Sequence, residues 1–483
     1  MVEHTLCEGF IFIVSSRRYG SMQIEKEIEQ SVKRIVASNK DIIKTQKELD
    51  TIILHTKEAL INSQYDFTNA NSIILNQNGK KRFVKHYEDI YSVENILCHC
   101  IKQILDRVFR IRYPNRNKTI KTLFSVLSAV RQMSDFTIIK FDFKDYFNSI
   151  SATYVFEKFL KPKLLDRFEI NLIRDFTYNT EYAYAGFCTS NVIAEIAAKY
   201  FDEMVKQIFA SKGVIYFERY IDDSILVLNE YIEEQEIKDM LNKSLLNIFY
   251  DEKIQPKVKC KAKFNNKKYQ YITRRLILKN PCSIDYLGYN FLFSYHNDKD
   301  RIEIKYGITP AKQAKYRKRL DKLISCYADK THQDYGNLEL LRHKIAAFTS
   351  REVYLNKRFH SNVWKVKGFI SNYGELRHLL ETDLIEDTTM DFLKNVVKDA
   401  FTKASIPLPY FISRNSQRSY GYNLYENMKS NKTILLVDHI GYDYNSLVKL
   451  CKQIGINNIN VNGKKRGYGT LVRDYLIKIK VGY

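Results

Sequence analysis

Glycine and proline are scarce in this chain, with 17 Gly and 7 Pro among 483 residues. Together they make up about 5% of the sequence, against roughly 12% in an average protein. This scarcity excludes collagen-like, linker-rich and low-complexity chains. Few helix-breaking residues favour long, well-packed elements, with helix dominant. The length suits about three domains or subdomains and needs no disulfide or metal to stabilise a core.

Long hydrophobic runs are also lacking. The apolar run at 9–14 is too short for a signal-peptide core or a membrane span, and no later stretch reaches 18 apolar residues. Of the eight cysteines, only Cys98 and Cys100 are close, and one intervening residue does not suit a zinc knuckle. Scattered cysteines without a framework are typical of a reducing cytoplasm. We therefore expect a cytoplasmic protein without a membrane partner.

Acidic residues are the minority charge. There are 55 Asp and Glu against 77 Lys and Arg, so the formal net charge is +22. A surplus of this size attracts polyanions to the clefts it lines, and the 35 tyrosines offer faces on which bases stack. The alternative is a lysine-rich surface that only keeps the protein soluble. The balance favours nucleic acid as a partner.

The spacing of apolar residues predicts the order of elements. Helices are predicted over 23–62, 92–113, 119–132 and 190–208. A strand at 136–143 and a β-hairpin at 214–228 stand between them. From about residue 308 the pattern is again mainly helical, with short strands near 433–437 and 456–461.

Three aspartates stand out against these strands. Asp142 lies between two phenylalanines near the end of one strand, and Asp222 and Asp223 are adjacent at the hairpin tip. Adjacent carboxylates repel, and a pair of Mg²⁺ ions about 3.5–4 Å apart would explain why they coexist. Such metals lower the pKa of an attacking 3′-hydroxyl and stabilise a leaving pyrophosphate. The alternative is a solvated Asp-Asp turn, which is common in hairpins.

Five segments, taken in order, resemble the motifs of reverse transcriptases. Phe-Asp-Phe-Lys-Asp-Tyr-Phe-Asn-Ser-Ile at 141–150 resembles motif A, and Gly-Phe-Cys-Thr-Ser-Asn-Val-Ile-Ala-Glu at 186–195 resembles motif B. Tyr-Ile-Asp-Asp within 219–224 resembles motif C. Pro-Lys-Val-Lys at 256–259 resembles motif D, and 285–291 resembles the primer grip. Order and spacing agree over roughly residues 75–295.

Within that superfamily the chain most resembles the bacterial abortive-infection and other defence-associated reverse transcriptases. The features that carry this resemblance are Tyr-Pro-Asn-Arg-Asn at 113–117, the Thr-Ser-Asn form of motif B and the long helical C-terminal part. The resemblance implies an RNA-directed DNA polymerase acting in antiviral (anti-phage) defence.

The resemblance also implies the architecture. We expect an α+β right-hand polymerase, with fingers and a palm built on an antiparallel β-sheet, followed by a mainly α-helical thumb and a C-terminal extension. The expected divisions are an N-terminal arm and helical extension at 1–66, fingers and palm at 67–300, a thumb-like region at 301–395 and an extension of unknown role at 396–483.

Residue roles follow from the motif positions. The expected catalytic and metal-binding residues are Asp142, Asp222 and Asp223, which would hold two Mg²⁺ ions, with Mn²⁺ as an alternative. Lys257 would protonate or neutralise the pyrophosphate. The expected nucleotide-binding residues are Phe143 through its backbone carbonyl, Tyr146 or Phe147 under the sugar, Arg116 on the triphosphate, Gly186 for close backbone approach, and Ser190.

For several of these residues a structural role is the alternative. One of the two rings Tyr146 and Phe147 is expected to be core, and Ser190 serves equally well as a helix cap. Arg116 could bind phosphate bidentately or lie on the surface. Tyr286, Leu287 and Gly288 resemble the turn that supports the primer end, and the alternative is a purely structural hairpin.

Motif B departs from the family pattern, because Tyr-Ala-Gly at 184–186 replaces the usual Pro-Gln-Gly. The missing Gln leaves open a template-independent or protein-primed DNA polymerase with the same site. A catalytically silent nucleic-acid-binding scaffold is a further alternative. RNA synthesis is disfavoured by Tyr-x-Asp-Asp and by the aromatic residues after motif A.

The expected partners follow from this reading. They are an RNA template (a dedicated non-coding RNA among the choices), a DNA product and dNTPs. The N- and C-terminal helices are expected to contact a second copy of the chain or a partner protein.

Overall fold

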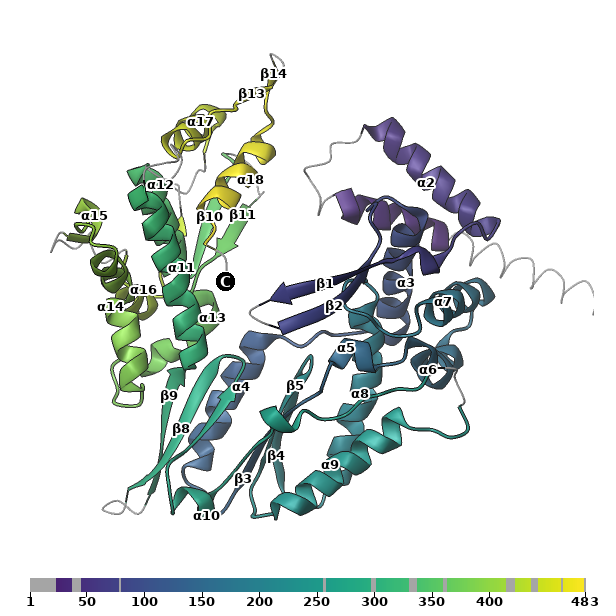
Figure 1. The fold of residues 1–483 in the computed structure, drawn as a ribbon, viewed down its shortest axis with the longest axis horizontal. Helices are drawn as coiled ribbons and strands as arrows, with labels where there is room; N and C mark the ends of the chain where they lie inside the picture. The colour runs from purple at the N-terminus through teal and green to yellow at the C-terminus, as the bar shows by residue number, and fades with distance from the viewer. Residues whose placement is uncertain are drawn as a thin grey trace, which may run out of the picture. The chain divides into compact units, whose positions relative to one another are not determined.

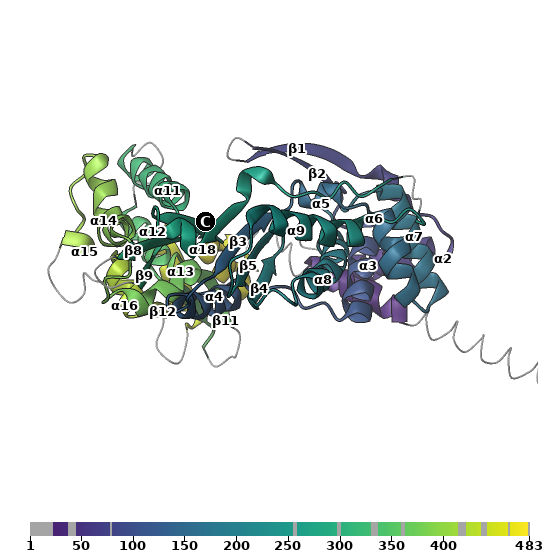
Figure 2. The same ribbon diagram turned by 90° about the horizontal axis from the view of Figure 1, so that it is seen from below.

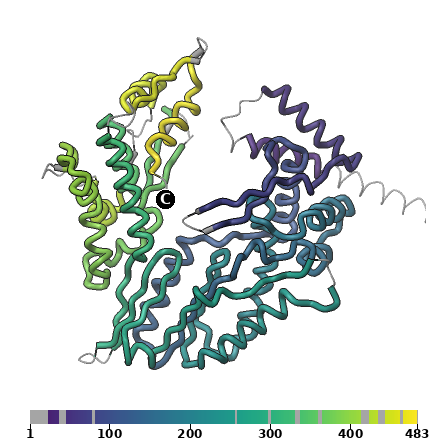
Figure 3. Tube along the Cα trace, in the orientation of Figure 1, coloured from purple at the N-terminus to yellow at the C-terminus, as the bar shows by residue number. Residues whose placement is uncertain are grey.

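The computed structural model describes residues 23–36, 45–77, 80–254, 258–296, 301–329, 337–358, 363–413, 422–435, 442–461 and 464–481, which are coloured in Figure 3. The chain divides into two compact units. The first consists of Met1–Asn115 and Phe136–Tyr271, and the second of Arg116–Asp135 and Ile272–Tyr483. Among the described residues no helix is long and apolar enough to cross a membrane.

The first unit is built on a four-stranded sheet with the order β4-β5-β3-β6 (Figure 1). Its strands are β3 (Thr137–Asp142), β4 (Val214–Tyr220), β5 (Asp223–Leu228) and β6 (Gln270–Thr273), of which Ile272 and Thr273 are counted in the second unit. β3 pairs antiparallel with β5, and β5 with β4. All six residues of β3 are buried, so this strand lies inside the unit rather than at its surface. The predicted strand and hairpin are therefore confirmed.

Helices and one separate hairpin complete this unit. In addition to a helix at 23–36, they are α2 (Gln46–Ile61), the hairpin β1 (Asn71–Gln77) and β2 (Lys80–His86), α3 (Val93–Phe109), α5 (Tyr146–Ser149), α6 (Ala152–Val155), α7 (Arg167–Thr180), α8 (Ser190–Ile208) and α9 (Glu234–Phe249). The predicted N-terminal helix is thus two helices, and α2 begins at a capping box in which Thr45 and Glu48 satisfy each other's backbone N–H groups.

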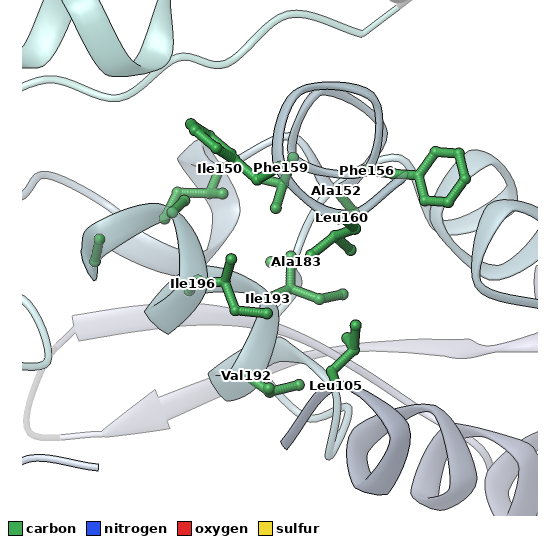
Figure 4. Packing of buried hydrophobic residues seen from close by; sticks show 14 of the residues in the cluster. Leu105, Ile150, Ala152, Phe156, Phe159, Leu160, Ala183, Val192, Ile193 and Ile196 are labelled. Carbon is green, nitrogen blue, oxygen red and sulfur yellow. The ribbon is translucent and has the colours of Figure 1, made fainter. Parts of the chain in front are cut away.

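The core of the first unit centres on α8, whose bounds match the prediction. Apolar residues three and four apart put one stripe of α8 into the core, and Figure 4 shows Val192, Ile193 and Ile196 packed near Leu160 and Leu105. Burying each such side chain contributes about 1.5–3 kcal/mol relative to exposure. In the view of Figure 2, α8 and α9 lie beside the sheet, so the sheet is held by a rigid helical layer.

The second unit contains two three-stranded sheets and a set of helices. One sheet has the order β7-β8-β9 and the other β11-β10-β12, with β10 and β12 parallel. The first comprises β7 (Cys282–Tyr286), β8 (Tyr289–His296) and β9 (Arg301–Ile308), and the second β10 (Glu352–Asn356), β11 (Val363–Lys367) and β12 (Thr433–Leu435). Phe124 of α4 (Arg116–Val130) packs on three aromatic rings of β8 and β9: Tyr289, Phe291 and Tyr306.

The remaining elements of the second unit are mostly helical, as the sequence predicted. They are α10 (Arg274–Ile277), α11 (Pro310–Asp329), α12 (Leu338–Thr349), α13 (Ile370–Tyr373), α14 (Asp387–Lys403), α15 (Tyr410–Ser413), α16 (Leu424–Lys429), α17 (Tyr444–Gln453), the strands β13 (Asn460–Val461) and β14 (Lys464–Lys465), and α18 (Tyr468–Ile479).

The fold class is α+β with mainly antiparallel sheets, as expected, but the divisions differ from the sequence-based ones. The segment 116–135 joins the second unit, although it was expected within the fingers and palm. So does 272–300, because β7 pairs with β8 and β8 pairs with β9. Residues 301–395 and 396–483 belong to one unit, because β12 pairs with β10 and α14 packs against α16. Packing between segments far apart in sequence decides these boundaries.

Gly186 is a position where the backbone leaves no room for a side chain. Its φ is +112°, and an added Cβ would lie 2.6 Å from Val84 Cγ1 and closer still to the Lys85 carbonyl oxygen. We expect Gly186→Ala to lower the free energy of unfolding by about 2 kcal/mol or more, measured by urea denaturation. Gly374→Ala is the matched control, because an added Cβ there meets nothing within 4 Å. Equal stability of the two variants would contradict this account.

Candidate active site

Sheet pairing brings the three sequence-predicted aspartates to one end of β3 and β5. Asp142 and Asp223 are direct partners in the antiparallel register, so their Cα atoms lie about 4.5–5.5 Å apart. The backbone N–H of Phe143 donates to the Asp222 carbonyl at 3.2 Å and continues this pairing into the turn. Residues separated by 80 positions in the sequence therefore share one site.

The turn between β4 and β5 has an unusual backbone. Tyr220 pairs with Asp223, which leaves Ile221 and Asp222 as a two-residue loop. Ile221 has φ +62°, although hairpins normally place Gly at such a position and β-branched residues disfavour it. Arg219 Nη1 donates to the Ile221 carbonyl at 2.7 Å. This hydrogen bond holds the loop that carries Asp222.

Arg219 is itself anchored to α8. Its side chain is 1% exposed and forms ion pairs with Glu195 at 2.9 Å and Asp202 at 2.8 Å, each through two hydrogen bonds. Burial outweighs the guanidinium charge and raises the pKa of Asp202 to about 6. Removing the guanidinium from such a buried network would leave two carboxylates uncompensated, which costs about 3–5 kcal/mol. The hairpin tip is thereby fixed to the central helix.

The aspartates are electrostatically unfavourable as a group. Burial, followed by repulsion from Asp142, raises the pKa of Asp222. Burial raises the pKa of Asp223 to about 7, with repulsion from Asp142 and Asp222 adding to the rise and Lys140 opposing it. Lys140 Nζ lies 3.7 Å from Asp223 Oδ1. The site therefore favours any further positive charge that reaches it.

A second lysine, which the sequence reasoning missed, meets Asp142. Lys268 Nζ lies 2.5 Å from Asp142 Oδ2, and the backbone N–H of Asn265 donates to the Asp142 carbonyl at 2.8 Å. Burial lowers the pKa of Lys268, but Asp142 outweighs it and the net pKa is raised. The only sequence signal is the lysine-rich stretch after 256. Lys257, the expected proton donor, lies outside the described residues.

The donor chemistry fits a divalent metal. Carboxylate oxygens are the ligands that Mg²⁺ prefers, and mutual repulsion among the three aspartates is relieved by bound cations. The described residues contain no group of three or more His, Cys, Asp or Glu side chains already arranged to hold a metal ion; Asp142 contacts Lys268 instead. Arg82 of β2 adds a positive charge that acts on Asp222. The site thus combines three carboxylates with the positive charges of Lys140, Lys268 and Arg82.

The two aromatic candidates after Asp142 differ in burial. Tyr146 is 5% exposed and its hydroxyl donates to the Ala194 carbonyl at 3.3 Å. Burial raises its pKa far above the usual range. Phe147 is only partly buried, and its ring packs on that of Tyr146 with centroids 5.1 Å apart. Tyr146 is therefore a core residue that packs on Phe147, and Phe147 is the more exposed of the two rings.

Other motif residues have structural partners. The Phe143 ring is 2% exposed within an aromatic cluster. Gly186 approaches the backbone of β2, whose Lys85 N–H donates to the Ala185 carbonyl at 2.9 Å. The Ser190 hydroxyl donates to the Tyr184 carbonyl, so it closes the loop before α8 rather than capping the helix. These contacts fix the loop 184–190 on the β1–β2 hairpin.

Four predicted residues belong to the second unit, whereas the three aspartates belong to the first. Tyr286 is fully buried, and Leu287 and Gly288 form a tight turn with φ of +49° and +86°. Arg116 donates to the carbonyls of Leu287 and Asn372, both at 2.6 Å. Its guanidinium therefore holds this turn, and its binding to a triphosphate stays a prediction.

Comparison with known proteins adds little. No family model matches the chain, and no curated protein matches it. A solved structure of telomerase from Candida albicans, in complex with a TWJ fragment of telomeric RNA, is similar with a TM-score of 0.32 and 13% identity. The match covers 46% of this chain and 44% of that chain, so this chain spans less than half of the telomerase chain. Likeness at this level carries no argument, and function is inferred from the residues themselves.

Because the three aspartates repel one another, we expect that removing the charge of one of them stabilises the folded protein. Because the pKa of Asp223 is about 7 in the fold against 3.8 for the free group, the folded state holds more protons between these values, and stability falls as pH rises through them. We expect Asp223→Asn to raise the free energy of unfolding by about 1–2 kcal/mol at pH 8, with the gain shrinking to nothing near pH 4.

Metal-free denaturation curves at several pH values would measure this effect. Asp239→Asn is the matched control, because this carboxylate is on an exposed position of α9 and accepts a hydrogen bond from Gln235 Nε2 at 2.9 Å. If the free energy of unfolding at pH 8 is larger for the wild type than for Asp223→Asn, repulsion among the aspartates does not destabilise the fold.

Proposed function

We propose that this chain is an RNA-directed DNA polymerase that uses two-metal nucleotidyl transfer. The observation that carries the proposal is the register that pairs Asp142 with Asp223 and sets Asp222 beside them. Three mutually repelling, partly buried carboxylates are a standing destabilisation without a cationic ligand. Their order along the chain also matches the motifs that resemble reverse transcriptases.

In this proposal the chain's own residues bind and position the reactants. Asp142, Asp222 and Asp223 would hold two Mg²⁺ ions, or Mn²⁺, which lower the pKa of the attacking 3′-hydroxyl and stabilise the leaving pyrophosphate. Arg219 keeps the Asp222 loop in place through the Ile221 carbonyl. The positive charge of Arg82, on β2, acts to lower the pKa of Asp222. This guanidinium would contact phosphate. Lys268 would leave Asp142 when a metal binds.

The proposed partners are an RNA template, a DNA product and dNTPs, supported by the net charge of +22. The proposed role in anti-phage defence rests on the resemblance of the motifs to defence-associated reverse transcriptases.

A template-independent or protein-primed DNA polymerase is the second candidate, and one observation favours it. The segment 184–186, which replaces the usual Pro-Gln-Gly, packs on the β1–β2 hairpin. The Tyr184 ring meets Phe83 at 5.2 Å between centroids, and Lys85 Nζ lies 4.5 Å above it. No amide side chain is offered at this position to align a template base.

A primer-extension assay tests both candidates. Nuclease-treated protein with Mg²⁺ would receive labelled dNTPs, with and without an added RNA template. We expect template-dependent DNA from the wild type, and at least 10³-fold less from Asp222→Ala, because one metal ligand is lost. Asp239→Ala is the control and should keep full activity.

The outcomes separate the readings. DNA made without template favours the second candidate. Activity retained by Asp222→Ala, or full phage protection by that variant in cells, would refute every enzymatic reading and leave a binding scaffold. Salt-sensitive RNA binding should survive in Asp222→Ala under either polymerase reading.

Sugar discrimination gives a separate prediction. A ring under the sugar clashes with a 2′-hydroxyl, the group that distinguishes ribonucleotides. We expect Phe147→Val to raise the ratio of kcat/KM for NTPs over dNTPs at least tenfold. Tyr146→Phe is the control, since it keeps the buried ring and loses only the bond to Ala194. An unchanged ratio in Phe147→Val would remove Phe147 from the nucleotide site.

A further inference from the structure

A cavity of about 380 Å³ lies within the second unit, with all of its lining residues in that unit. It is bordered by the first turns of α4, the ends of β10 and β11, the segment 370–378 and the turn after α16. This volume lies in the range of about 300–1,000 Å³ that is typical of small-ligand sites. Of the motif residues, Asn117 of the 113–117 segment and Tyr289 of the primer-grip-like segment line it.

The lining carries an excess of positive charge. It includes the cationic side chains of Lys121, Arg351, Lys367 and Arg377, together with two carboxylates. One of these, Glu352, is shared between Lys365 at 3.3 Å and Arg351 at 3.7 Å. Among the described residues, Lys121, Lys367 and Arg377 form no ion pair with a carboxylate. The cavity is therefore electropositive.

Two guanidinium groups converge inside it. With its side-chain oxygen turned toward them, Asn431 accepts from Arg377 Nη1 at 2.8 Å and from Arg351 Nη1 at 3.0 Å. Two cations thus share one neutral amide oxygen; Glu352 lies 3.7 Å from Arg351, and among the described residues no carboxylate forms an ion pair with Arg377. Asn431 has φ +47°, in the left-handed region that Asn tolerates better than most residues. This conformation ends α16, where the Asn431 N–H donates to the Met428 carbonyl at 3.0 Å.

We propose that this cavity binds a polyphosphate group, either as free pyrophosphate or as the phosphate tail of a nucleotide. Guanidinium forks match phosphate oxygens bidentately and form charge-assisted hydrogen bonds with them. A phosphate oxygen would replace the Asn431 oxygen between the two arginines, with Lys121 and Lys367 on the same cavity wall. This site belongs to the second unit and is independent of the proposed polymerase chemistry.

The convergence of Arg351 and Arg377 on one atom favours a compact anion over a nucleic-acid strand as the ligand. Phosphodiester tracks are contacted by cations spaced along a surface, one charge per phosphate. Here the two arginines meet at a single atom in a bounded cavity. Concentrated positive charge of this kind suits a terminal phosphate or pyrophosphate, which carries more than one negative charge within a few ångströms.

Gly374 offers a way to block the cavity without disturbing the fold. It lines the cavity, has φ −60°, and an added Cβ meets nothing within 4 Å. Gly374→Glu would bring a carboxylate into the electropositive space, whereas Gly374→Ala would leave it open. The pair separates loss of the anion site from loss of folding.

Isothermal titration calorimetry with inorganic pyrophosphate, in EDTA, tests the proposal. EDTA removes the divalent metal that phosphate binding at the aspartates requires. We expect wild type and Gly374→Ala to bind pyrophosphate, and both Arg351→Met/Arg377→Met and Gly374→Glu to bind at least tenfold more weakly. Lys318→Met/Lys322→Met on α11 removes the same charge elsewhere and should bind as wild type does. Parallel titrations with ATP, dATP and adenosine would show whether a nucleotide or free pyrophosphate is preferred, and adenosine should not bind.

Several results would overturn the proposal. One is that the wild type binds neither pyrophosphate nor nucleotide. Another is that Gly374→Glu binds pyrophosphate as tightly as the wild type does. A third is that the wild type binds a DNA oligonucleotide but not pyrophosphate, which would assign the cavity to a nucleic-acid strand. Circular dichroism would establish that each variant is folded. If the double arginine variant is unfolded, the comparison of Gly374→Glu with Gly374→Ala tests the proposal. Asp222→Ala should bind pyrophosphate in EDTA like the wild type, so failure of the polymerase proposal and failure of this one are distinguishable.

Discussion

The like charge of three carboxylates is the constraint around which the first unit is arranged. Antiparallel pairing of β3 with β5 forces Asp142 and Asp223 together, and the hairpin tip adds Asp222. Burial makes their repulsion stronger than it would be in water. Lys140 and Lys268 reduce it from the protein side. A sheet end with this charge pattern is stable enough to fold and still favours added cations, which is what metal-dependent phosphoryl chemistry requires.

Holding those carboxylates depends on a chain of contacts that passes through α8. Arg219 ties the strained loop at Ile221 to Glu195 and Asp202 of that helix. The loop leading into the same helix packs on the β1–β2 hairpin, where Gly186 leaves no room for a side chain. The buried stripe of α8 then fixes both to the core. Strain at a site of this kind persists only because the surroundings over-determine the backbone.

The second unit uses arginine in two contrasting ways. Arg116 has its donors bound to the carbonyls of Leu287 and Asn372 and lies over the rings of Tyr289 and Tyr373. It is a structural tie within an aromatic core. Arg351 and Arg377 instead meet at one neutral oxygen in a cavity. The Arg116 donors are satisfied by carbonyls, whereas Arg351 and Arg377 share a neutral acceptor that a phosphate oxygen could replace.

The local pattern of apolar, polar and turn residues in the sequence determined where these helices, strands and motifs lie along the chain. The bounds of α8, the hairpin 214–228 and the strand of Asp142 follow from periodicity and turn residues, because these depend on neighbours within a few positions. Tertiary structure alone decided the rest: that Lys268 meets Asp142, that Arg219 anchors the Asp222 loop, that Tyr146 is core while Phe147 is not, and that Arg116 belongs with Leu287. Each of those depends on packing between segments far apart in sequence, and such pairings leave no periodic signal in the chain.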